Sequence, residues 1–112
     1  EEEWKKIEFA EAHFGSSTLP LVFPVLYDRL HKQIDLGQLI QWLSINPRRI
    51  MGIDQAIPEV DRTIDFTWID PQQETEFTAR DFPSKSKNSS LLDRSWKGSI
   101  KGVFYQENYD LF

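Results

Sequence analysis

Cysteine is absent from this 112-residue chain, and histidine occurs only twice. Without cysteine the chain can form neither a disulfide framework nor a thiolate metal site, and it has no thiol nucleophile. The two imidazoles, His13 and His31, are too far apart in the sequence to be paired metal ligands on one helix. We therefore expect this chain to bind no metal and no cofactor by itself.

Basic charge, long apolar runs and phosphate-binding motifs are also missing. The 13 basic residues are outnumbered by 18 acidic ones, which leaves a formal charge of -5 and little capacity to neutralise a nucleic-acid backbone. No apolar run approaches the about 20 residues that span a bilayer, and the acidic start, Glu1 to Glu3, is unlike a signal peptide. No glycine-rich phosphate loop or G-x-S-x-G motif occurs. These absences argue against nucleic acid and membranes as partners and favour a soluble, intracellular protein.

The chain is rich in apolar and aromatic side chains. Hydrophobic residues make up 39% of it and aromatic residues 13%, including four tryptophans. This composition is typical of a folded protein, and the length allows one domain or part of one. Large aromatic side chains are most often core residues, because each buries roughly 150–250 Å². Composition alone predicts a folded core and indicates no activity.

The first half of the chain carries helical patterns that end at Gly52. Residues 2–13 mix apolar and acidic side chains at helical spacing, and Gly15 is suited to end that helix. A second helix should begin near Leu19, with a hydroxyl side chain from residues 16–18 as its cap, and Pro24 should bend it or delay its start.

A third helix and a short fourth one are predicted next. Asp35 is suited to cap a helix whose apolar face includes Leu39 and Leu43. Asn46 and Pro47 should then restart a short helix that ends at Gly52. The helical half of the chain should end there.

After Gly52 the period of the apolar residues changes from that of helices to that of strands. Ile64, Phe66 and Trp68 alternate with polar residues in a predicted strand that Asp70-Pro71 should end. Gly98 and Gly102 indicate a bulge or a close backbone approach in a later strand. The remaining predicted segments are a second short strand at 74–78, a loop at 83–90 and alternating residues at 100–105. The expected fold class is α+β, with helices first and strands second.

Three segments carry motifs of a known family. Residues 14–26 begin F-G-S-S-T-L-P, and residues 39–53 contain L-S-I-N-P-R-R-I-M-G, which is similar to an L-S-x-N-P-x-R-I-x-G element. Residues 65–71 read D-F-T-W-I-D-P, and residues 82–88 read F-P-S-K-S-K-N, which is similar to a strand, a D-P turn and an S-K-S-x-N loop. Together these segments resemble the C-terminal part of dihydroorotases, which belong to the cyclic amidohydrolase superfamily.

The resemblance implies one part of a larger enzyme. In this family a TIM barrel holds zinc on its early and middle strands, and a catalytic aspartate ends the eighth strand. Residues 1–52 would then be the last barrel helices with a substrate loop, and residues 53–112 a few strands of a small accessory β-sandwich. The resemblance implies substrate contact at Phe14 and Gly15, and neither a catalytic residue nor a zinc ligand within this chain.

The implied whole protein is a cytoplasmic dihydroorotase, which interconverts N-carbamoyl-L-aspartate and dihydroorotate with a zinc-activated hydroxide as nucleophile. Two alternatives stay open. One is another cyclic amidohydrolase such as a hydantoinase. The other is a non-catalytic scaffold that binds aspartate carbamoyltransferase, suggested by Thr18 and Pro20, where the family commonly has Gly and Glu or Gln. Because its apolar faces lack partners, we expect the isolated chain to form a homo-oligomer or to bind the remainder of the barrel.

Overall fold

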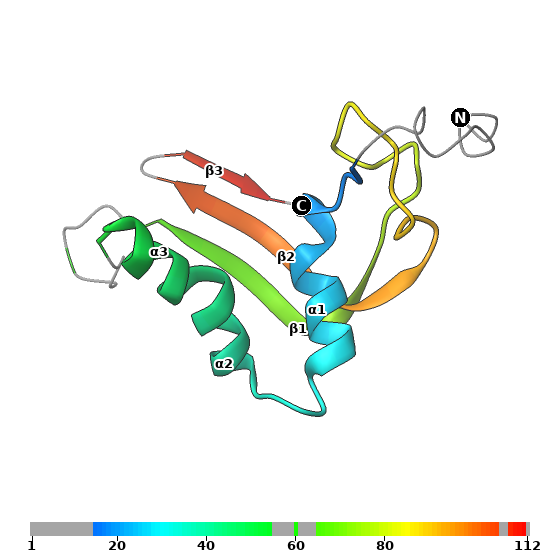
Figure 1. Cartoon of the computed structure of the whole chain (residues 1–112). Coiled ribbons are helices and arrows are strands. Elements are labelled where there is room, and N and C mark those ends of the chain that lie inside the picture. Colours follow the sequence, from blue (N-terminus) through cyan, green and yellow to red (C-terminus); the bar gives the residue numbers. More distant parts are fainter. Residues whose placement is uncertain (1–14, 55–59, 61–64, 106–107, 112) are drawn as a thin grey trace.

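The computed structural model describes residues 15–54, 60, 65–105 and 108–111 (Figure 1). Helices come first and an antiparallel sheet follows, so the α+β arrangement predicted from the sequence is confirmed. The helix predicted at residues 2–13 lies outside the described residues. The elements are α1 (Val22–Leu30), α2 (Leu36–Ile40), α3 (Asn46–Met51), β1 (Phe66–Glu76), β2 (Ser95–Tyr105) and β3 (Asn108–Leu111).

The chain enters α1 through a short 3-10 turn. This turn spans Leu19–Leu21, and the N–H of Leu21 donates to the carbonyl of Thr18 (2.8 Å). Pro24 lies in the first turn of α1, where its missing N–H has no intrahelical acceptor. The predicted delay of the helix start is confirmed. The predicted hydroxyl cap is wrong, because the side chain of Thr18 makes no capping hydrogen bond.

One helical run replaces the two helices predicted after residue 35. Asp35 caps this run as predicted, with its Oδ1 accepting from the N–H of Gln38 (2.8 Å). A π-helical turn, Gln41–Ile45, joins α2 directly to α3. The predicted cap at Asn46 is therefore wrong, since Asn46 is itself helical. Pro47 has no N–H to donate, and a widened turn just before it accommodates that missing donor.

The helical run ends as the sequence predicts. Gly52 adopts a left-handed conformation with φ of +67°. The next N–H, that of Ile53, donates back to the carbonyl of Arg48 (2.9 Å), which satisfies one of the free carbonyls of the last turn. None of the described helices is both long enough and apolar enough to cross a membrane.

The three strands form one antiparallel sheet in the order β1-β2-β3. The prediction that Asp70-Pro71 ends the first strand is wrong, because β1 continues to Glu76. At the expected turn the pairing between β1 and β2 is interrupted. Asp70 pairs with Ser99, and the next pair is Glu74 with Lys97. Between these two pairs β1 therefore has two more residues than β2. Pairing with the long β2 resumes beyond it, and the short strand predicted at 74–78 is thus the second half of β1.

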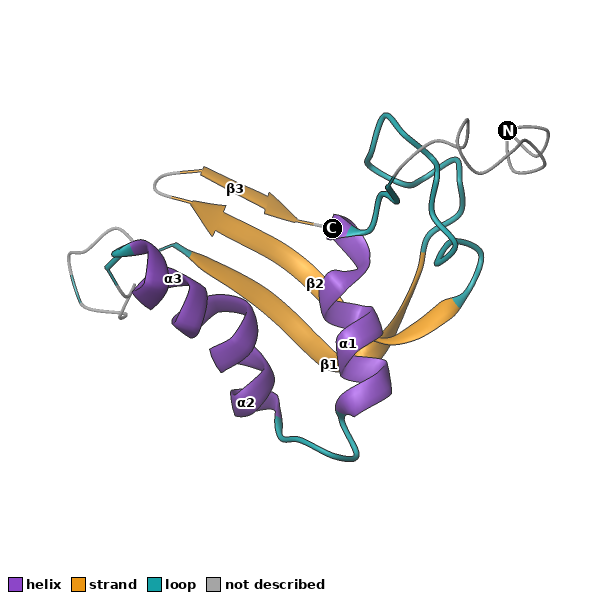
Figure 2. Ribbon diagram, viewed as in Figure 1, coloured by secondary structure: helices purple, strands orange, loops and turns teal. Residues whose placement is uncertain are grey.

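Two glycines of β2 allow close contacts on either side of that strand. Gly98 has φ of +98°, and a Cβ atom there would lie 3.1 Å from Cδ1 of Tyr27 in α1. At Gly102 a Cβ atom would lie 2.8 Å from the carbonyl oxygen of Asp110 in β3. The predicted close approach at both glycines is confirmed. Figure 2 shows the result, with α1 running across the sheet.

The core joins the start of the helical half to the loops that follow β1. Leu21 is fully buried and packs with Phe82, Leu92 and Trp96 in one cluster. The indole N–H of Trp96 donates to the carbonyl of Leu91 (3.0 Å), so the buried ring keeps its polar atom paired. Two members of this cluster, Leu21 and Phe82, are close in sequence to the two loops described next.

Candidate functional site

The predicted substrate-contact residues come just before the 3-10 turn. Phe14 lies outside the described residues. Gly15 is exposed and has φ of +84°, a conformation that favours glycine. Apart from Gly15 and its chain neighbours, no described residue has an atom within 4 Å of the position that a Cβ atom would take there. Glycine is therefore favoured at this position by backbone conformation rather than by crowding.

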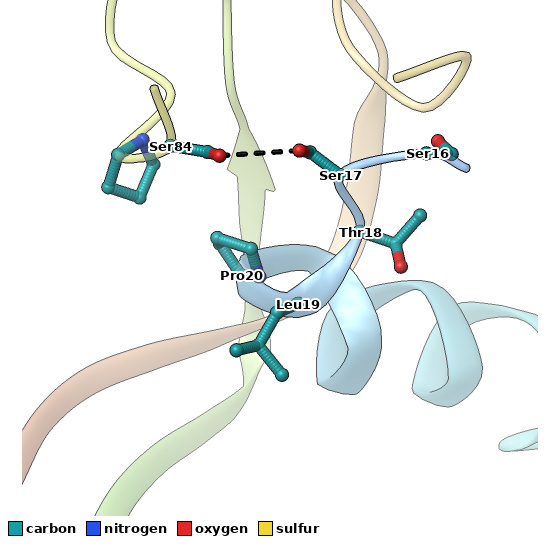
Figure 3. A pocket seen from close by; sticks show the side chains of 7 residues that line it. Ser16, Ser17, Thr18, Leu19, Pro20 and Ser84 are labelled. Carbon is teal, nitrogen blue, oxygen red and sulfur yellow. Dashed lines mark hydrogen bonds between the residues drawn. The ribbon is translucent and has the colours of Figure 1, made fainter. Parts of the chain in front are cut away.

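Two loops that carry family-like motifs lie side by side; we call them loop 15–18 and loop 83–88. The N–H of Ser17 donates to the carbonyl of Asn88 (2.8 Å), and the hydroxyl of Ser16 donates to the same oxygen (3.2 Å). The side-chain amide of Asn88 donates to the carbonyl of Gly15 (2.8 Å). Ser17 and Ser84 share a hydroxyl–hydroxyl bond of 3.3 Å (Figure 3). The two loops are thus joined by main-chain and side-chain hydrogen bonds.

Sequence reasoning assigned the hydroxyl residues of loop 15–18 to helix capping and missed this contact. The partners are 67 to 73 residues apart in the sequence, so local spacing gives no sign of it. The sequence feature that could have indicated the contact is the pair of motifs F-G-S-S and S-K-S-K-N, because both belong to the family resemblance.

Both loops are anchored on the same core cluster. Loop 15–18 leads into Leu21, and loop 83–88 follows directly on Phe82, whose side chain is 1% exposed. The ammonium of Lys87 donates to the carbonyl of Phe82, and this bond connects the end of loop 83–88 to the residue just before it. The relative position of the two loops is therefore set by buried packing as well as by their own hydrogen bonds.

A shallow hollow of about 380 Å³ opens beside the two loops. In Figure 3 the hydroxyls of Ser17 and Ser84 point toward each other, while Thr18 points away from them. The lining side chains offer hydroxyl groups, and none of them is an acid or a base near neutral pH. Among the residues that the structure describes, the lining can hold a polar group by hydrogen bonds and includes no proton-transfer residue. Its lining consists of Ser16, Ser17, Thr18, Leu19, Pro20, Pro83 and Ser84.

Metal-binding side chains do not gather in the described part of the chain. His31 is engaged at the end of α1, where its Nδ1 lies 2.9 Å from the carbonyl of Asp28 and its ring stacks on Tyr27. His13 lies outside the described residues. Among the residues that the structure places, no group of three or more His, Asp or Glu side chains could hold a metal ion.

A larger apolar groove of about 770 Å³ lies between the helices and the sheet. Leu39 is 1% exposed, so this part of the predicted apolar face is covered, whereas Leu43 is 38% exposed. Arg48 and Asp65 are the charged residues of the lining. The apolar lining residues include Val22, Phe23, Leu39, Ile40, Leu43, Phe66, Ile69, Ile100, Val103 and Phe104.

A row of aromatic side chains crosses the sheet. Phe66 and Phe104 stack with ring centroids 4.2 Å apart, and Phe104 and Tyr109 with centroids 5.9 Å apart. Trp68 comes two residues after Phe66 and so shares its face of β1. Trp68 is 54% exposed and Tyr109 is 65% exposed. We call these four residues the aromatic row; such exposure of neighbouring large apolar groups is typical of a contact surface.

No model of a known protein family matches the chain, whereas curated relatives do. The chain is 40% identical to the dihydroorotase of Chlorobaculum tepidum over 99 aligned positions, and the alignment covers 85% of this chain and 22% of the relative. It is 36% identical over 109 residues to the dihydroorotase of Geobacter sp. (strain M21), covering 91% of this chain and 26% of the relative. The dihydroorotase of Elusimicrobium minutum is 30% identical over 102 aligned positions, and the alignment covers 89% of this chain and 24% of the relative. The chain thus spans about a quarter of the length of these relatives, and over that segment it belongs to the dihydroorotase family.

Proposed function

We propose that this chain is the C-terminal part of a dihydroorotase that interconverts N-carbamoyl-L-aspartate and dihydroorotate in pyrimidine biosynthesis. The observation that carries the proposal is the 30–40% identity to dihydroorotases over 85–91% of the chain. The contact between loop 15–18 and loop 83–88 supports it, because the family-like motifs meet beside a hollow of a size suited to a small polar molecule. In this proposal the chain contributes substrate contacts, and the rest of the enzyme contributes the catalytic groups.

The proposed substrate contacts are at Phe14 and Gly15. Gly15 is exposed and has no side chain, so a small ring can approach its main chain closely. The hydroxyls of Ser16 and Ser17 follow directly and are held by loop 83–88. A rigid polar loop of this kind favours binding of a ligand that carries carbonyl and carboxylate oxygens.

The zinc that the family resemblance implies does not fit the residues of this chain that the structure describes. A catalytic zinc takes three protein ligands, and no cluster of three suitable side chains occurs among the described residues. We therefore assign zinc binding to the part of the complete enzyme beyond this chain, and we assign loop 15–18 no role in holding the metal.

We further propose that residues 1–52 form the last helices of a TIM barrel and residues 53–112 form strands of its accessory sandwich. The groove and the aromatic row are then surfaces that the rest of the enzyme covers. Burying a large apolar side chain contributes roughly 1.5–3 kcal/mol, so covering the exposed Trp68 and Leu43 alone would stabilise the complete protein measurably. In the isolated chain the same surfaces favour a homo-oligomer.

The test is an assay of the complete cytoplasmic protein with dihydroorotate and with carbamoyl aspartate. We expect turnover in both directions. Turnover of hydantoins without turnover of dihydroorotate would instead identify another cyclic amidohydrolase. A folded protein that turns over neither, and that binds aspartate carbamoyltransferase in a pull-down, would identify a scaffold.

A chimera provides a second test that depends on the segment itself. The segment of the Chlorobaculum tepidum dihydroorotase that matches this chain is replaced by this chain. Because the two segments are 40% identical, we expect the chimera to retain dihydroorotate turnover, whereas the same enzyme truncated before the segment should lose it. A folded chimera with no more activity than the truncated enzyme would contradict the proposal.

A further inference from the structure

Asn88 holds three consecutive residues of loop 15–18. Its main-chain carbonyl accepts from the N–H of Ser17 and from the hydroxyl of Ser16, and its side chain donates to the carbonyl of Gly15. A carbonyl oxygen can only accept a hydrogen bond, so the side-chain atom that faces it, 2.8 Å away, must be the amide nitrogen. The contact therefore requires an amide at this position and not only a side chain of similar shape.

We propose that Asn88 is a positioning residue for substrate binding, a role that rests on the proposed function. Asn88 fixes the peptide plane between Gly15 and Ser16 by holding the Gly15 carbonyl. In a trans peptide the carbonyl and the following N–H point in opposite directions. The N–H of Ser16 is thereby turned away from loop 83–88. In this proposal the Ser16 N–H, held in a fixed direction, is the donor that the loop presents to an oxygen of a dihydroorotate-like ligand.

The position of Asn88 separates this role from a contribution to the core. Asn88 and Gly15 are both exposed, and the buried cluster beneath them is built from Leu21 and Phe82 instead. The core fixes where the two loops lie, and the amide of Asn88 fixes how the Gly15 peptide is oriented between them. Removing the amide should therefore disturb the orientation of the loop and leave the fold intact.

The test uses the complete enzyme and four variants: Asn88→Ala, Asn88→Asp, Ser84→Ala and, as a control, Asn108→Ala at an exposed position of β3. In Asn88→Ala we expect KM for dihydroorotate to rise about fivefold, the factor that corresponds to one typical hydrogen bond, with kcat changed by less than about twofold. Asn88→Asp keeps the shape of the side chain but faces the Gly15 carbonyl with an acceptor, so KM should rise at least as much.

Ser84→Ala removes only the hydroxyl contact to Ser17 and leaves the Gly15 carbonyl held, so its KM should rise less than that of Asn88→Ala. Asn108→Ala should match the wild type.

The split between KM and kcat distinguishes positioning from a merely structural role. A structural role would lower the folded fraction and the apparent kcat, while KM of the molecules that remain folded would not change. Wild-type KM in both Asn88 variants, alongside dihydroorotate turnover by the wild type, would overturn this inference and leave the proposed function standing. Absence of turnover in the wild-type enzyme would overturn the proposed function, and the inference with it.

Discussion

Replacing Gly98 with alanine should loosen the contact between α1 and β2. Gly98 has φ of +98°, and the added methyl group would stand 3.1 Å from Cδ1 of Tyr27 and 3.2 Å from Cε1 of Phe23. A positive φ costs a residue with a side chain about 1–2 kcal/mol. Crowding against two aromatic rings adds about 1–3 kcal/mol. Together the two effects should lower the free energy of unfolding by about 2–5 kcal/mol, a large part of the about 5–15 kcal/mol typical of a native protein.

Urea denaturation followed by tryptophan fluorescence measures this loss, since Trp96 is 4% exposed and reports on the core. The matched control is Gly52→Ala. Gly52 also has a positive φ, of +67°, but outside its own segment of chain no described residue has an atom within 4 Å of the position that an added Cβ atom would take. The control should therefore lose only the conformational part, about 1–2 kcal/mol. Equal losses in the two variants would refute the reasoning that Gly98 is needed for close packing of α1 on β2.

Three further predictions concern the isolated chain. Asp35→Ala should lower the free energy of unfolding by about 1 kcal/mol in the same urea assay, because the N–H of Gln38 loses its acceptor; an unchanged midpoint would show that the cap contributes nothing. Sedimentation velocity at micromolar concentration should show self-association that Trp68→Ser weakens, since Trp68 is 54% exposed; a wild-type chain that stays monomeric would contradict this. After dialysis against zinc and then buffer, elemental analysis should find no stoichiometric metal in the chain, and one tightly held ion per chain would count against our assignment of the zinc site.

Features that depend on a single residue could be predicted from the sequence. Asp35 caps its helix because a carboxylate next to free N–H groups needs no distant partner. Gly52 ends the helical run, and Gly98 adopts a positive φ within β2, because each relies on the conformational freedom of glycine. The α+β class followed from the change of period after residue 52.

Features that depend on distant partners could not be predicted in this way. Asp70-Pro71 gives a strong turn signal, yet β2 is long enough to pair on both sides of the turn, so β1 continues. The strand β3 is only four residues long and was not predicted. In the candidate site, Ser16 and Ser17 precede a helix and so fit a capping pattern. Their hydroxyls instead form hydrogen bonds with Asn88 and Ser84 of loop 83–88. The presence of the site motifs could be recognised, whereas their contact could not.

The separation between Gly15 and Asn88 has a consequence for biosynthesis. The two residues are 73 positions apart, so loop 15–18 is synthesised well before the residue that orients it. At a translation rate of about 5–20 residues per second, the interval is roughly 4–15 s. During this time the Gly15 segment has no partner from loop 83–88. The ligand-contacting shape that we propose for it would be a late product of folding, acquired only after the helices and β1 have been synthesised.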